Sequence, residues 1–316
     1  MPPRYQWIWI SRQCRDALND SGPRSRMDIP AILTALNLGP DGVYSYAFEN
    51  TAQSDEIQLR ESVAANCADN YMEHISIHHS IPVMDREVTH FLRSVRRNGV
   101  ILDVGGSWGW HWRSLHEARP DVGVIILDFI RNNLLQARKV LGQQVGRNVF
   151  LVHGDATCLK FADASFDSVW SVQTLQHIPA FETVVREIFR VLKPGGLFAN
   201  YSLNDPLLIR FLYGLLGKKW HSKGYVPGAF YLARASRQQE ALLEEVFQSP
   251  CQNRYTEVLF TPELRLRFPG RDGSLSGSLD SLLSSDSPYF SWIARQQSFH
   301  VEKPSSRTGL RCPQAE

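Results

Sequence analysis

Three aspartates in the middle of the chain indicate a binding site for a ligand rich in hydroxyl groups. Asp103, Asp128 and Asp155 each stand at, or just after, the end of a short apolar run. Apolar runs of this kind, separated by helical segments, are typical of buried parallel strands, whose carboxyl ends share one edge of a sheet. We therefore expect the three carboxylates to face one crevice. There Asp128 would accept the hydroxyls of a ribose, and Asp155 an exocyclic amine of a base.

A glycine turn, Gly105-Gly106-Ser107-Trp108-Gly109, follows the first of these runs. A dinucleotide-binding turn needs G-x-G-x-x-G, and this frame has Ser107 and Trp110 at two of the glycine positions. Asp103 beside the turn would repel a pyrophosphate, whereas it suits a cationic ligand without phosphates. The chain also has no phosphate-binding G-x-x-x-x-G-K-[ST] motif. The turn therefore favours a nucleoside cofactor over a dinucleotide or nucleotide.

Alternating strands and helices must position these residues. The fold class expected is α/β, a Rossmann-like, doubly wound and mostly parallel seven-stranded sheet with a helical N-terminal segment and C-terminal insertions. Residues 56–97 look largely helical, with a break near Ile81-Pro82. The strands expected are 100–104, 122–128, 149–153, 166–172, 197–202, 254–260 and 298–301. The helices expected are 112–118, 132–141, 181–192, 207–216, 233–247 and 289–297.

The same pattern divides the chain into four parts. Residues 1–66 are expected to be an irregular N-terminal segment, and 67–203 the cofactor-binding core. Residues 204–303 would supply substrate-side insertions and closing strands, including a Gly/Ser-rich stretch over 270–287. Residues 304–316 are expected to be a disordered tail.

Composition narrows the function classes. With 316 residues, 43% of them hydrophobic and 21% charged, the chain has a globular composition. A net charge of +2 gives no reason to expect a nucleic-acid partner. Five scattered cysteines without a C-x-x-C pair predict no zinc site and fit a reducing cytoplasm. No signal peptide, transmembrane segment or metal site is expected.

Five segments together resemble the class I S-adenosylmethionine-dependent methyltransferases, in the small-molecule branch that includes ubiquinone-biosynthesis-type enzymes. The first is the glycine turn with Asp103 before it, and the second is Asp128, matching the family's ribose-binding acid. The other three are Gly154-Asp155-Ala156, which matches the adenine-contacting motif, and the stretches 161–169 and 191–198 around the fourth and fifth core strands. The resemblance covers residues 98–203, and one departure is Ser107, where the family has a glycine.

The resemblance implies S-adenosyl-L-methionine as cofactor and a specific set of binding residues. The cofactor-binding residues it implies are Asp103, Gly105, Gly106, Ser107, Gly109, Asp128, Phe129, Asp155, Ala156 and Gln173. His177, which follows the fourth core strand, is the candidate general base for an acceptor that must lose a proton, with a structural role as its alternative. The candidate substrate-binding residues are Tyr71, Tyr201, Asn204 and Trp220.

The activity implied is methyl transfer by in-line displacement to a small-molecule acceptor. O- or C-methylation of a glycosidic, aromatic or lipid-linked metabolite would suit the aromatic-rich flanking segments, and the 207–220 segment could touch a membrane surface. The alternatives are an RNA methyltransferase and a non-catalytic cofactor-binding subunit. Trp108, Trp110 and Trp112 are expected to serve packing, and His111 to have a satisfied polar role. The sequence does not determine the oligomeric state.

Overall fold

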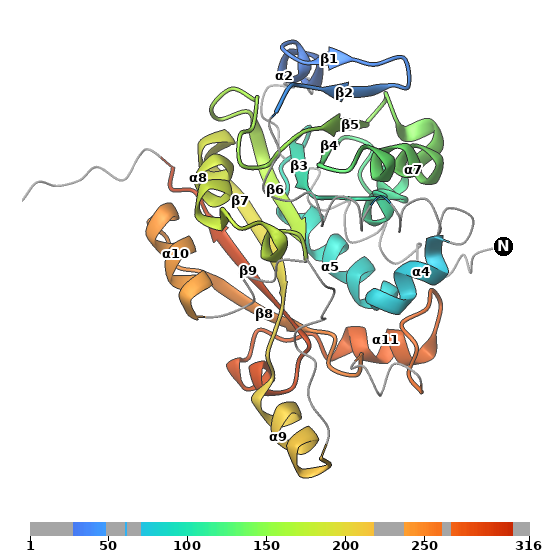
Figure 1. The fold of residues 1–316 in the computed structure, drawn as a ribbon, viewed down its shortest axis with the longest axis vertical. Coiled ribbons are helices and arrows are strands. Elements are labelled where there is room, and N and C mark those ends of the chain that lie inside the picture. The colour runs from blue at the N-terminus through green and yellow to red at the C-terminus, as the bar shows by residue number, and fades with distance from the viewer. Residues whose placement is uncertain (1–27, 49–60, 62–70, 218–236, 261–266, 306–316) are drawn as a thin grey trace, which may run out of the picture.

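The computed structural model describes residues 28–48, 61, 71–217, 237–260 and 267–305, which build an α/β fold around one sheet (Figure 1). Within these residues the sheet has nine strands in the order β1-β2-β5-β4-β3-β6-β7-β9-β8. Neighbouring strands from β2 to β7 are parallel, and β1, β9 and β8 pair antiparallel. The strands are β1 Asn37–Leu38, β2 Val43–Ser45, β3 Val100–Val104, β4 Gly123–Asp128, β5 Val149–His153, β6 Phe166–Val172, β7 Leu192–Leu203, β8 Gln252–Thr256 and β9 Gln296–Glu302.

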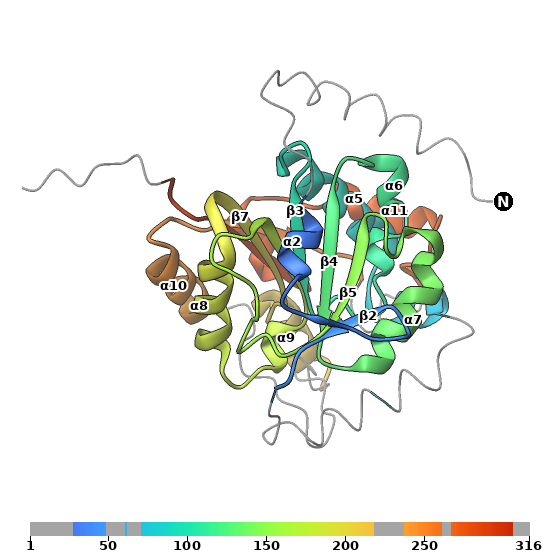
Figure 2. The ribbon, with the colours of Figure 1, turned by 90° about the horizontal axis from the view of Figure 1, so that it is seen from above.

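Helices cover both faces of the sheet, and each face has its own apolar core (Figure 2). Helices α2, α8 and α10 pack on one face, and α5, α7 and the short helix η3 pack on the other. The helices named here are α2 Ile29–Leu33, α4 Tyr71–His78, α5 Ile81–Ser94, α6 Leu115–Ala118, α7 Arg131–Leu141, α8 Phe181–Val191, α9 Leu207–Leu215, α10 Arg237–Phe247 and α11 Leu275–Leu282. The short 3-10 helices are η3 Trp110–Trp112, η4 Gly142–Gln144, η5 Leu175–His177 and η7 Pro288–Trp292. No helix in the described part of the chain has the length and apolar character needed to cross a membrane.

The central strands confirm the expected α/β fold. β3, β5 and β6 have the expected bounds, because strands buried on both faces appear in the sequence as nearly continuous apolar runs. Helix α5 begins at Ile81 with proline in its first turn, as the expected break required. β7 begins at Leu192 instead of residue 197, because Leu192 already pairs with Phe166.

The strand count and three local assignments differ from expectation. The two extra strands, β1 and β2, lie in the N-terminal segment expected to be irregular, and β2 adds in parallel to the edge strand β5. The Gly/Ser-rich stretch contains helix α11, which Ser274 caps by accepting a bond from the Gly277 N–H. The aromatic helix expected over 289–297 is the short η7, after which β9 begins. The predicted disordered tail lies almost entirely outside the described residues.

Candidate cofactor and acceptor site

The glycine turn between β3 and η3 has a backbone that tolerates few side chains. Gly105 and Gly109 have φ angles of 72° and 66°, in the left-handed region that favours glycine. A Cβ on Gly106 would come within 2.2 Å of an Asp103 carboxylate oxygen. Ser107, at the position where the family has a glycine, also adopts a left-handed φ, of 49°. The turn thus keeps a glycine-type path with one strained serine in it.

Asp103 lies beneath this turn, which differs from the expected position facing the crevice. Its carboxylate is 1% exposed and accepts a 2.6 Å hydrogen bond from Trp112 Nε1. Register explains the depth: Val104 of β3 pairs with Leu127, so Asp103 stops short of the edge at which Asp128 ends β4. Burial raises the pKa of Asp103 to about 7, and the nearby Asp128 charge adds to the rise. In this structure Asp103 supports the turn from below.

Asp128 lies at the end of β4 and is bonded to the turn. Its Oδ2 accepts the Ser107 N–H at 2.9 Å, and its Oδ1 accepts the Ile130 N–H at 2.8 Å. Asn133 Nδ2 also donates to Oδ1, at 3.2 Å, while the Asn133 side-chain oxygen accepts from Trp108 Nε1 at 3.2 Å. These bonds hold the carboxylate against the backbone of the turn.

The turn after β5 brings Asp155 and Ala156 to the same edge. The Gly154 N–H donates to the Asp128 carbonyl at 3.1 Å, so this turn lies beside the end of β4. Asp155 Oδ1 accepts the Thr157 N–H at 2.8 Å, and Ala156 is 6% exposed. Asp128 and Asp155 therefore lie at the same edge of the sheet, as the sequence predicted.

The N-terminal segment adds aromatic residues to this edge that the sequence analysis did not assign. The Tyr46 hydroxyl donates to the Asp155 carbonyl at 2.8 Å. The Phe48 ring lies 5.6 Å from the ring of Phe129, the residue after Asp128, and 5.2 Å from that of His153. The only signal in the sequence was the aromatic alternation Tyr44, Tyr46, Phe48. This cluster provides apolar surface beside the carboxylates, which suits a planar base.

His177 lies in η5, directly after the loop that closes β6. Thr174, three residues earlier, donates its hydroxyl to the Gly105 carbonyl at 3.1 Å, which ties this loop to the glycine turn. Gln173 has a φ of 50° and its side-chain amide donates to Gln296 Oε1 at 3.0 Å. Both predicted residues thus lie on the segment that borders the turn, and His177 as a base stays a prediction.

The four predicted substrate residues have different surroundings. Tyr71 is half-buried and packs against the core of the α5 face. Tyr201 is fully buried, and its hydroxyl donates at 3.1 Å to Glu87, which also pairs with Arg254. The Asn204 amide donates to the carbonyls of Ser291 and Ala294, which joins β7 to η7. Trp220 lies outside the described residues.

A buried group of histidine and tryptophan side chains next to the turn was not recognised from the sequence. His111 is 9% exposed, and neither ring nitrogen has a hydrogen-bond partner among the residues that the structure describes. The same holds for His79 Nδ1 and Trp170 Nε1. The His111 ring centroid lies 6.5 Å from that of His79 and 6.0 Å from that of Trp170. The expectation of a satisfied polar role for His111 is therefore wrong within the described chain.

Burial keeps this group uncharged. It lowers the pKa of His111 to about 3, and it holds the pKa of His79 well below its usual value. Both imidazoles are therefore neutral near neutral pH and can each donate and accept one hydrogen bond. Trp108, Trp110 and Trp112 are 3%, 2% and 0% exposed, which confirms their packing role. The His111 ring nitrogens and Trp170 Nε1 thus remain hydrogen-bonding groups without a partner in the described chain.

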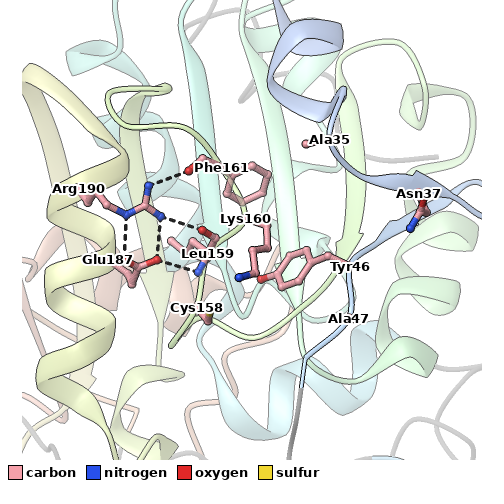
Figure 3. A pocket seen from close by; sticks show the side chains of 10 residues that line it. All are labelled: Ala35, Asn37, Tyr46, Ala47, Cys158, Leu159, Lys160, Phe161, Glu187 and Arg190. Atoms are coloured by element: carbon pink, nitrogen blue, oxygen red, sulfur yellow. Dashed lines mark hydrogen bonds and ion pairs between the residues drawn. The ribbon is translucent and has the colours of Figure 1, made fainter.

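A separate hollow of about 720 Å³ lies on the opposite face of the sheet, between α8 and the 158–161 segment (Figure 3). Arg190 fills one wall: it pairs with Glu187 at 2.8 Å and donates to the carbonyls of Leu159 and Phe161. Tyr46 lines the hollow as well and is its link to the cofactor edge. Since Arg190 and Glu187 in its wall are paired with each other, this part of the hollow has a structural role.

The central part of the chain is similar to known proteins. Residues 102–200 match the family model described as a methyltransferase domain. The demethylmenaquinone methyltransferase of Listeria welshimeri is 37% identical over 122 residues, which are 38% of this chain and 52% of that protein. That of a Geobacillus species is 33% identical over 127 residues, which are 40% and 54% of the two chains.

The chain therefore spans about half the length of the curated relatives that it matches. Among solved structures, a Thermotoga maritima protein described as an S-adenosylmethionine-dependent methyltransferase superposes with a TM-score of 0.50 at 16% identity. The superposition covers 77% of this chain and 99% of that one, and it supports the fold.

Proposed function

We propose that this protein is a class I S-adenosylmethionine-dependent methyltransferase of the ubiquinone- and menaquinone-type branch that methylates a small-molecule acceptor, because residues 102–200 match a methyltransferase domain and resemble demethylmenaquinone methyltransferases. S-adenosyl-L-methionine is the cofactor, and it supplies an electrophilic methyl group. The observation that carries the proposal is the bond from the Ser107 N–H to Asp128 Oδ2, which fixes a carboxylate against the glycine turn.

The donor set at the edge suits this cofactor. In this proposal Asp128 accepts the ribose hydroxyls, and the Asp155–Ala156 turn receives the base beside Phe129 and Phe48; the bonds of Asp128 to the turn and the neighbouring rings support it. No lysine or arginine occurs within residues 105–109, so the turn offers no cation for a phosphate. Residues that accept hydrogen bonds, an apolar wall and no phosphate-binding cation fit a cationic nucleoside.

The protein's main contribution to methyl transfer is alignment and exclusion of water. The rigid turn supplies alignment, because Thr174 and Asp128 bind its backbone from two sides. The buried tryptophans of 108–112 keep water from the underside of the turn. For a hydroxyl acceptor, His177 accepts the proton that the acceptor loses; for an acidic carbon it does the same.

The neutral group formed by His79, His111 and Trp170 supports an acceptor that combines a ring with a hydroxyl or carbonyl oxygen. Aromatic rings and hydrogen-bonding groups without a partner among the described residues occur together there. An aromatic or lipid-linked metabolite combines these features, and the similarity to demethylmenaquinone methyltransferases agrees with that class. Whether the product is O- or C-methylated depends on which acceptor atom attacks the methyl group.

The test is transfer of a radiolabelled methyl group from the cofactor into fractions of an extract from the source cells, followed by mass spectrometry of the product. The purified wild-type protein should label one low-molecular-weight fraction, and Asp128→Ala should label it far less. A wild-type protein that binds the cofactor in calorimetry yet labels no fraction would contradict the proposal. That result would favour a non-catalytic subunit, and label in RNA would favour an RNA methyltransferase.

A further inference from the structure

Helix α9 presents apolar side chains to solvent on one whole face. Leu207, Phe211 and Leu215 follow one another at intervals of four residues and are 61%, 61% and 69% exposed. Leu208 and Leu212, on the adjacent row, are 42% and 44% exposed, and none of the helix is buried. A surface helix of a soluble protein turns such a row toward the core. In α9 the apolar row faces solvent instead.

This face is continuous with further exposed apolar residues. Leu216, directly after the helix, is 71% exposed. α9 packs against η7, where Tyr289 and Trp292 are 80% and 57% exposed. Many large apolar side chains exposed together are uncommon on a soluble monomer and mark an interaction site. We call Leu207, Leu208, Phe211, Leu212, Leu215, Leu216, Tyr289 and Trp292 the α9 face.

The sequence that follows α9 is cationic. Lys218 and Lys219 come three and four residues after Leu215 in the sequence, and Lys223 follows. The helix itself carries one charged residue, Arg210, which pairs with Asp205 at 2.7 Å. Leucine and phenylalanine on one face, aromatic side chains at its border and lysines after it in the sequence are the composition of a helix lying in the interface of an anionic bilayer.

The position of α9 in the fold agrees with contact to a bilayer. α9 projects from one end of the molecule, away from the helices that cover the sheet (Figure 1). It begins at Leu207, three residues after Asn204, which follows directly on the carboxyl end of β7. The carboxyl ends of the parallel strands form the cofactor edge. A surface that receives the α9 face would therefore lie near the entrance to that edge.

We propose that the α9 face docks the protein on the surface of an anionic lipid bilayer. The proposal deepens, and rests on, methylation of a small-molecule acceptor, because docking there would deliver a lipid-linked acceptor to the cofactor edge. The helix lies in the interface with its apolar face toward the acyl chains.

The experiment is flotation of the full chain with phosphatidylcholine vesicles, with and without phosphatidylglycerol. The wild-type protein should float with the anionic vesicles, and less so as salt is added. The double change Phe211→Asp and Leu215→Asp should lower the bound fraction at least about tenfold, because two large side chains lose their apolar environment. Leu38→Asp is the matched control: Leu38 is 59% exposed but lies in β1, outside the α9 face, and this variant should float like the wild type.

Thermal unfolding and oligomeric state separate the other occupants. The double variant should unfold at the wild-type temperature, since α9 buries none of its residues in the described chain. A clear loss of thermal stability would show that residues 218–236 of the same chain cover the face. A wild-type protein that is dimeric, together with a double variant that is monomeric, would show that a second copy covers the α9 face. Either result, or wild-type protein that does not float, overturns the proposal.

Cofactor binding by calorimetry, in solution and without vesicles, is measured in parallel. A protein that floats but does not bind S-adenosyl-L-methionine would retain the docking surface and contradict the proposed function. A protein that binds the cofactor but does not float would keep the proposed function and contradict the docking surface.

Discussion

The indole Nε1 of Trp112 donates a 2.6 Å hydrogen bond to the buried carboxylate of Asp103, underneath the glycine turn. This bond joins the first turn of helix after the loop to the strand before it, so both ends of the loop are held by one contact. Burial nonetheless raises the pKa of Asp103 to about 7. The support beneath the cofactor loop therefore titrates near neutral pH.

Asp103→Asn should change how stability depends on pH. The folded protein holds a proton on Asp103 that the unfolded chain releases near its ordinary pKa, so wild-type stability falls as pH rises between about 4 and 7, by up to about 1.4 kcal/mol per pH unit. Asparagine stays neutral, so this fall should be absent in the variant. Denaturant unfolding across that range measures it, and parallel profiles for the two proteins would rule out the assignment.

Asp128→Ala should weaken binding of S-adenosyl-L-methionine by about 1.5–3 kcal/mol, because a charge-assisted contact to the ribose is lost. The variant also loses the acceptor for the Ser107 N–H, so the turn becomes less ordered. Isothermal calorimetry gives the affinity. Asp163→Ala is a suitable control, since Asp163 is an exposed partner of Arg190 away from the turn. Unchanged affinity in Asp128→Ala would remove the ribose assignment.

Ser107→Gly should raise the free energy of unfolding by about 0.5 kcal/mol, because glycine adopts the left-handed φ of this position without steric cost. Ser107→Val should lower it by more than that, since a β-branched residue fits this region poorly. Both are measured by denaturant unfolding. If the glycine variant were the less stable of the two, the strain at Ser107 would not exist.

Tyr46→Phe should lower cofactor affinity through the turn after β5. The variant loses the 2.8 Å bond to the Asp155 carbonyl, worth about 0.5–1.5 kcal/mol, and keeps the ring that packs near Phe48. Tyr44→Phe, two residues away in β2, changes the same chemical group and should leave affinity as it was. Equal affinities for both variants in calorimetry would mean that the hydroxyl does not position the turn.

His177→Ala should slow turnover of an acceptor that must lose a proton, and should remove the pH dependence that a general base gives the rate. Cofactor affinity should stay at the wild-type value, because His177 lies after the turn that Thr174 secures. His116→Ala, at an exposed position in α6, is the control. Unchanged turnover across the pH range would leave His177 a structural residue.

The sequence predicted the parallel core well because its signals are local. Strands β3 and β5 are nearly continuous apolar runs, and Asp128 at the end of β4 and Asp155 after β5 lie at one edge for the topological reason expected. The depth of Asp103 depends on the register between β3 and β4, which no local pattern carries. The carboxylate beside the turn could therefore be predicted from the sequence, whereas its burial beneath the turn could not.

Helix α11 and the contact between His79 and His111 were not predicted, because they depend on contacts between residues far apart in the sequence. α11 packs on α5 through small residues: Gly277 lies against Pro82, and its leucines Leu275, Leu279 and Leu282 are exposed. A Gly/Ser-rich composition therefore concealed a helix. His79 and His111 meet only through tertiary structure, and their sequence neighbours gave no reason to pair them.

The strand β2 has a consequence for how the molecule avoids self-association. Without it, the five-residue β5 would be the outermost strand of the parallel sheet, with one row of backbone groups open to a strand from another molecule. Val43, fully buried, pairs with Leu151 and covers that row, and the sheet then ends in the two-residue β1. A chain shortened to begin after residue 48 would expose the edge of β5. Copies of it should then join edge to edge and precipitate, so the N-terminal strands protect the fold from aggregation as well as bordering its cofactor edge.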